Sequence, residues 1–231
     1  MDGGKQSREP CVSREAAAET VAAVLAEGFA PDAIAEAVSL AANQLVLRDP
    51  GRTVARDGKP LGGVHGDSVV VHASDAANAW RKIVRISDRR NAVASLIVAA
   101  YHTVGQRQGQ RDGEEEAQAL GDGPSDSSTP ATQLAEAVRE KDHARAVSIV
   151  QCAGALDLDA RPMFDVLIEF ATSEDGALHA EKYFRTATEE FALGREAFRF
   201  RHLAGLARVT ASEYGTTAPG YARASELLGC G

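Results

Sequence analysis

Cysteine, aromatic residues and long apolar runs are all scarce in this sequence, and each shortage excludes a class of protein. Only three cysteines occur among 231 residues, and none is in a Cys-x-x-Cys pair. This argues against a zinc knuckle and is typical of a reducing compartment. No run of about 18 apolar residues is present, so nothing is expected to span a membrane. The polar residues 1–10 lack the apolar stretch of a secretory signal. We therefore expect a cytoplasmic protein with no membrane partner.

Strand-forming patterns and glycine-based catalytic motifs are equally scarce. Aromatic residues make up 5% of the chain, whereas hydrophobic residues make up 44% and alanine dominates. This composition predicts an all-α protein whose helices pack closely. The chain has no phosphate-binding loop, no Gly-x-Gly-x-x-Gly after a strand and no Gly-x-Ser-x-Gly elbow. Nucleotide-binding and α/β-hydrolase sites are therefore not indicated.

Positive charge is also in short supply. The formal net charge is −8, and basic residues gather only over 81–90. An acidic chain without a basic face is a poor partner for nucleic acid or an anionic membrane. We expect the basic residues at 81–90 to form a solvated face or a clamp between two parts of the molecule.

Composition and hydrophobic periodicity divide the chain into two helical halves that form one composite domain. Residues 1–12 are expected to be a disordered tail, and 13–105 the first half. Residues 106–131 have almost no large apolar side chains and are expected to be a flexible linker. Residues 132–231 are the second half. Helices are predicted at 13–27, 31–48, 72–86, 89–105, 132–140, 143–153, 162–173, 179–193, 195–213 and 221–228.

One arrangement of helices and histidines occurs in both halves. His72 and His179 each begin a predicted helix, and the helix that follows carries His102 or His202. Such a repeat predicts two halves packed about a pseudo-twofold axis, with equivalent positions meeting near it. Asp75 and Lys182 follow the leading histidines by three residues, so they share a helix face with them. A structural ion pair between the two is one interpretation.

The histidines are the best candidates for chemistry. An imidazole in an apolar helix needs a polar partner, and a metal ion is one such partner. Several imidazoles with few carboxylates suit iron, zinc, copper or nickel. His72 and Asp75 with one further histidine also match the two-histidine, one-carboxylate pattern of non-heme iron. His65 is a reserve ligand, while His143 at a polar helix start is expected on the surface.

Other residues complete the hypothesis. Trp80 and Tyr101 flank the expected site and are candidates to line a substrate pocket, although lone aromatic residues are more often core. The glycine-rich segment 49–68 is expected to be a loop that acts as a lid.

Two short motifs carry a resemblance to a known family. Residues 72–81 give a histidine, a Ser-containing turn and an Ala-Trp-Arg sequence, and residues 179–182 read His-Ala-Glu-Lys. With the segments 142–147 and 174–182, they resemble the questin oxidase-like family. The resemblance spans most of residues 31–213.

The resemblance implies an all-helical oxygenase that uses non-heme iron and O2 on an organic, polycyclic aromatic substrate. It also implies four histidine ligands and a carboxylated lysine. Carried onto this sequence, the ligands are His72, His102, His179 and His202, with Lys182 as the lysine. The chain is short for the family, so part of the usual substrate pocket is expected to be missing.

Two other functions stay open at this point. A non-catalytic helical-repeat protein would use the histidines structurally and act by binding a partner. A metal-dependent hydrolase would use a metal-bound water as its nucleophile. The leading expectation is an Fe(II)-dependent oxygenase.

Overall fold

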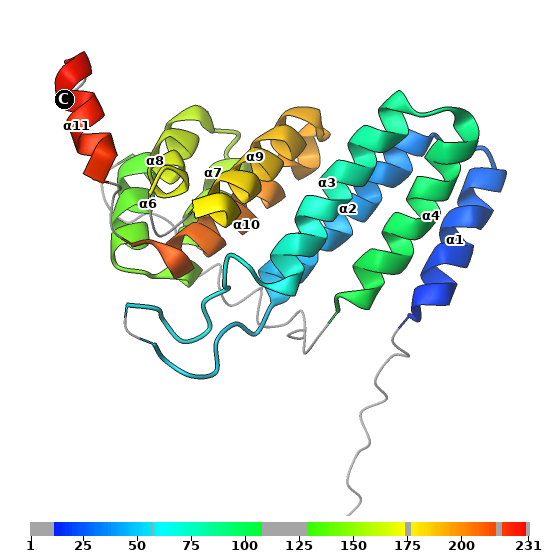
Figure 1. Cartoon of the computed structure of the whole chain (residues 1–231), viewed down its shortest axis with the longest axis horizontal. Helices are drawn as coiled ribbons and strands as arrows, with labels where there is room; N and C mark the ends of the chain where they lie inside the picture. The colour runs from blue at the N-terminus through cyan, green and yellow to red at the C-terminus, as the bar shows by residue number, and fades with distance from the viewer. Residues whose placement is uncertain (1–11, 57, 108–128, 174–176, 216–218, 230–231) are drawn as a thin grey trace, which may run out of the picture.

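The protein is all-α, as predicted. The computed structural model describes residues 12–56, 58–107, 129–173, 177–215 and 219–229. Within these ranges the chain forms ten helices and no strand (Figure 1). None of the helices described is both long and apolar enough to cross a membrane.

The first half forms four helices, which lie side by side in Figure 1. Their starts follow from the sequence, because Ser13, Ser68 and Asp88 each accept a hydrogen bond from a backbone N–H of the first turn. The Ser68 cap starts the third helix three residues earlier than the predicted residue 72. The helices are α1 (Arg14–Ala26), α2 (Pro31–Arg48), α3 (Val69–Ile86) and α4 (Arg89–Gly105).

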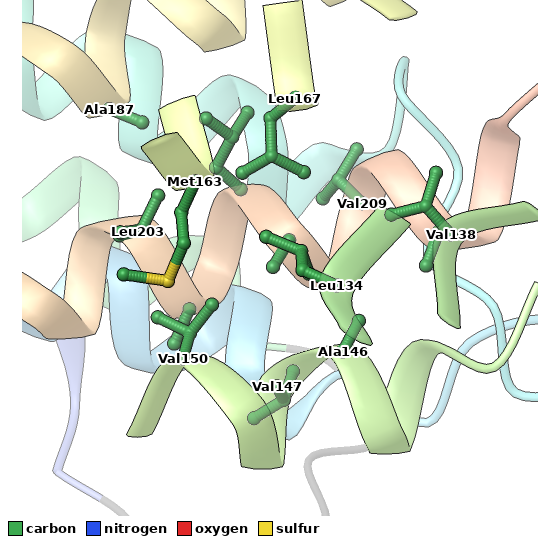
Figure 2. Packing of buried hydrophobic residues seen from close by; sticks show 14 of the residues in the cluster. Leu134, Val138, Ala146, Val147, Val150, Met163, Leu167, Ala187, Leu203 and Val209 are labelled. Carbon is green, nitrogen blue, oxygen red and sulfur yellow. The ribbon is translucent and has the colours of Figure 1, made fainter. Parts of the chain in front are cut away.

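The second half is built around one helix, α10. It packs against α6, α7, α8 and α9, and every residue from His202 to Glu213 is buried. Figure 2 shows Leu203 and Val209 of this helix within the apolar cluster. The helices of this half are α6 (Pro130–Arg139), α7 (His143–Ala155), α8 (Arg161–Ala171), α9 (Ala177–Leu193), α10 (Glu196–Glu213) and α11 (Pro219–Leu228).

The two halves share a core. The cluster around α10 also contains Val46, Val64, Val70 and Val71 from the first half. A second cluster lies among α1, α2, α3 and α4. Between the halves, α2 packs against α10 and α3 packs against α9. These contacts make one composite unit; a symmetry relating its halves stays a prediction.

The loop between α2 and α3 was predicted to be a lid, but much of it is anchored to α10. Arg208 of α10 donates hydrogen bonds to the carbonyl oxygens of Asp49 (2.6 Å) and Gly62 (3.4 Å). Gly51 has a φ of +70°, and a Cβ there would lie 2.2 Å from the Gly62 oxygen, so only glycine allows this turn. Glu213 forms ion pairs with Arg52 and with Lys59.

Most of the predicted linker lies outside the described residues. The structure ends α4 at Gly105 and begins α6 at Pro130, where the Thr129 hydroxyl accepts from the Thr132 N–H (3.3 Å). Residues 108–128 between them, and residues 1–11 of the predicted tail, are not described.

Candidate functional site

Two of the predicted histidine ligands meet where α3 packs against α9. The rings of His72 and His179 lie edge to face, with centroids 5.4 Å apart and an interplanar angle of 71°. One imidazole comes from each half of the chain. The two positions that the repeat predicts to be equivalent are therefore in contact in the structure.

The next turn of the same interface carries Asp75 and Lys182. The carboxylate of Asp75 accepts a hydrogen bond from the Thr186 hydroxyl (2.7 Å) and pairs with the Lys182 ammonium (3.2 Å). The Asp75 side chain is 4% exposed, whereas that of Lys182 is 48% exposed. Lys182 therefore reaches the buried Asp75 carboxylate from the surface. This is the structural ion pair that the sequence left as one interpretation.

A deeper layer of the interface is charged and fully buried. Arg81 donates to Glu190 (2.7 Å) and to the Leu193 carbonyl (3.1 Å), and the Asn78 amide donates to the other Glu190 oxygen (2.9 Å). Both charged side chains are almost inaccessible. The basic cluster predicted at 81–90 thus contributes Arg81 to a clamp between the halves, and Lys82 also pairs with Glu189 of α9.

His202 belongs to this deeper layer. Burial lowers the pKa of its imidazole to about 4, Glu190 acts in the opposite direction, and Arg81 lowers the pKa further. Arg81 is nine residues along α3 from His72, roughly 13 Å at the rise of an α-helix. His202 is thus a neutral core histidine beside a buried ion pair, apart from the level of His72 and His179.

His102 lies on α4 and has separate surroundings. Its Nε2 is 3.3 Å from the Gln106 amide. Its Nδ1 is buried and has no hydrogen-bond partner among the residues described. The structure therefore brings together two of the four predicted histidines.

The reserve ligand, His65, lies near His179. Both line a small cavity of about 100 Å³, which Tyr183 and Glu213 also border. The Nδ1 of His65 accepts a hydrogen bond from the Asp67 backbone N–H (3.1 Å) and lies against the Asp67 carboxylate. Burial lowers the pKa of His65, although Asp67 opposes the shift. His65 therefore lies close to His179, one of the two histidines that meet at the α3–α9 interface.

The two aromatic residues proposed for a substrate pocket do not line the cavity that His65 and His179 border. Trp80 packs against the cluster of the first half, and Tyr101 is 41% exposed with the Arg14 guanidinium over its ring. A pocket with several phenylalanine side chains lies between α8 and α9, and includes Phe164, Phe184 and Phe191. The spacing of Phe184 and Phe191, two helical turns apart, could have indicated a shared face.

The donor atoms at the α3–α9 interface fit non-heme iron in type. His72, His179 and Asp75 supply two imidazoles and one carboxylate, the set used by many iron oxygenases. In the described part of the chain, no three histidine, cysteine, aspartate or glutamate side chains are grouped closely enough to hold a metal ion. The ammonium of Lys182 pairs with the carboxylate of this set.

Comparisons with known proteins leave the family open. No family model, no curated protein and no solved structure matches the chain. The residues of the α3–α9 interface are therefore the best indication of function.

Proposed function

We propose that the protein is a non-heme iron oxygenase that acts with O2 on an organic substrate. His72, His179 and Asp75 would hold the metal. The observation that carries the proposal is the meeting of two imidazoles from the two halves, one helical turn from a buried carboxylate. Such a metal supplies the redox chemistry by which O2 reacts with an organic molecule.

The protein groups around the site have separate roles. The Thr186 hydroxyl fixes one oxygen of Asp75 and leaves the other facing Lys182. An ammonium has no lone pair for a metal. Lys182 therefore has to swing toward solvent, which its exposed side chain permits, or lose its protons, react with CO2 and become a ligand itself as an anionic carbamate. His65, on the wall of the adjoining cavity, would be a further ligand.

Metal analysis tests the proposal directly. Protein reconstituted anaerobically with Fe(II) should hold about one iron per chain, and His72→Ala or His179→Ala should remove it. His143→Ala is the matched control, because His143 contacts the Leu61 carbonyl outside the interface (3.2 Å). Less than about a tenth of an equivalent of iron in the unaltered protein would contradict the proposal.

Two further variants define the role of Lys182. If it is a carbamate ligand, Lys182→Ala loses iron and regains part of it with added acetate, while Asp75→Asn keeps iron. If Asp75 is the ligand, the outcomes are reversed: Asp75→Asn loses iron and Lys182→Ala retains or strengthens binding, because a competing cation is gone.

A non-catalytic helical protein is the second candidate. The observation that favours it is that the interface is already neutralised by the Asp75–Lys182 and Arg81–Glu190 pairs. This candidate requires no metal, so the same iron measurement separates the two. Oxygen consumption by the iron-loaded protein would then separate an oxygenase from a metal-dependent hydrolase.

A further inference from the structure

A second pocket lies between α8 and α9 and has a different chemistry. It has a volume of about 720 Å³ and is lined by α8, α9, Arg199 and the segment 157–160. This is within the range of small-molecule sites in proteins. Three phenylalanine rings and three aspartates contribute to its wall.

The phenyl rings form a corner. The Phe164 ring is nearly perpendicular to that of Phe184 (centroids 6.1 Å apart, 84°) and to that of Phe191 (5.2 Å, 86°). All three are only partly buried, so ring surface stays available to a ligand. Perpendicular aromatic walls are the arrangement by which proteins enclose ammonium groups.

One protein cation already lies over one of these rings, that of Phe191, and over the neighbouring Phe200 ring. The Arg199 guanidinium lies 5.3 Å from the centroid of Phe191 and 5.9 Å from that of Phe200. The faces of these rings thus accept positive charge in the protein itself. A ligand cation would meet the same kind of surface at Phe164 and Phe184.

The charges at the pocket favour a cation as well. Arg161 pairs with Asp165 (2.8 Å), and Arg199 pairs with Asp157 (3.4 Å). Asp159 accepts from a backbone N–H, that of Arg161 (3.0 Å), and forms no ion pair within the described residues. Three carboxylates against two guanidiniums leave one negative charge at the pocket, and Asp159 carries it.

We propose that this pocket binds a small organic cation, an alkyl- or arylammonium compound whose charged head lies against Phe164 and Phe184 beside Asp159. Coulomb attraction to the unpaired carboxylate and cation–π contact supply the selectivity for charge. The apolar part of the ligand fills the rest of the volume. Binding at this pocket does not depend on the proposed iron site, although Phe184 also borders the cavity of His65 and His179.

Calorimetric titration of the metal-free, full-length chain with choline and with its neutral isostere 3,3-dimethyl-1-butanol tests the proposal. Choline should bind about fivefold or more tightly than the isostere, in line with a cation–π contact plus one carboxylate. Benzyltrimethylammonium should bind more tightly still because it fills more of the pocket, and benzoate should not compete.

Matched variants locate the site. Asp159→Asn and Phe184→Leu should each weaken choline binding severalfold, whereas Phe29→Leu, at an exposed ring on the other half of the molecule, should not change it. The Asp159→Asn change is at a surface segment, so it reports on charge even if a phenylalanine variant alters the packing of α9. Equal binding of choline and its isostere, or affinity unchanged by Asp159→Asn, would overturn the proposal.

Discussion

At the scale of single residues, Gly205 shows how closely the two halves approach. A Cβ at this position would lie 2.5 Å from the Asn43 side-chain oxygen and 2.9 Å from the Tyr183 hydroxyl. Tyr183 is buried, and its side chain cannot easily move away in a packed interior. Gly205→Ala should therefore destabilise the protein by about 1–3 kcal/mol in urea denaturation, despite the higher helix propensity of alanine.

The control for this prediction is Gly220→Ala on α11. A Cβ there would meet no atom within 4 Å, so the free energy of unfolding should stay the same or rise slightly. If the two variants are equally stable, the close approach at Gly205 does not limit packing.

The buried ion pair of Arg81 and Glu190 gives a second prediction at this scale. Both side chains are almost inaccessible and 2.7 Å apart, so removing one leaves an uncompensated charge in the core. Arg81→Met or Glu190→Gln alone should each cost about 3–5 kcal/mol in chemical denaturation. The double variant should be more stable than the sum of the single effects predicts, because no lone charge remains.

A suitable control is the exposed pair of Arg161 and Asp165, joined at 2.8 Å on the surface of α8. Replacing Arg161 with Met should change stability by less than about 1 kcal/mol. Additive effects of Arg81→Met and Glu190→Gln would show that the buried pair is not coupled.

At the scale of elements, the end of α2 depends on α10. The last carbonyl groups of a helix lack partners within it, and here Arg208 supplies them. Its guanidinium donates to the oxygens of Val46 (2.5 Å), Leu47 (2.6 Å) and Asp49 (2.6 Å). One side chain of α10 therefore ends α2 and holds the loop that follows.

Replacing this guanidinium should loosen the loop more than the helices. Arg208→Lys keeps the charge but cannot reach several carbonyls at once. In hydrogen exchange, the amides of Arg52 and Gly62, which bond to loop carbonyls, should exchange about tenfold faster or more, while those of α7 stay protected. Arg223→Lys on α11 is the control, and unchanged exchange at Arg52 and Gly62 would show that the loop is held without Arg208.

Helices could be predicted from the sequence because their signals are local. Proline at the start of α2 and α6, and the serine and aspartate caps of α1 and α4, act on residues within one turn. The anchoring of the loop could not be predicted, because it depends on Arg208, a residue about 150 positions away in sequence. A glycine-rich loop has the same composition whether it is free or held.

At the scale of the whole molecule, the same limit applies to the candidate site. The repeat correctly suggested that Asp75 and Lys182 approach each other, and their atoms lie 3.2 Å apart. The repeat does not predict at which level of the helix interface each histidine lies. His202 lies near Glu190 and Arg81 and not near His72. Its position depends on how α10 packs against α9 and against α2 of the first half.

The stability of the whole chain should depend on pH through His202. Its pKa is about 4 in the folded protein and about 6.5 in an unfolded chain. Between these values the unfolded state binds more protons, so the free energy of unfolding falls as pH falls from about 6.5 to about 4. At about 1.4 kcal/mol per pKa unit, the loss is on the order of a few kcal/mol.

A variant without the imidazole isolates this contribution. The charged groups that act on His202 are Glu190, Arg81, Glu36 and Arg201. His202→Gln should flatten the decline in unfolding free energy between pH 6.5 and 4, measured by urea denaturation at several pH values. His65, whose side chain is 44% exposed, remains in the variant and contributes a smaller slope. A His202→Gln profile as steep as that of the unaltered protein would place the acid sensitivity in the carboxylates.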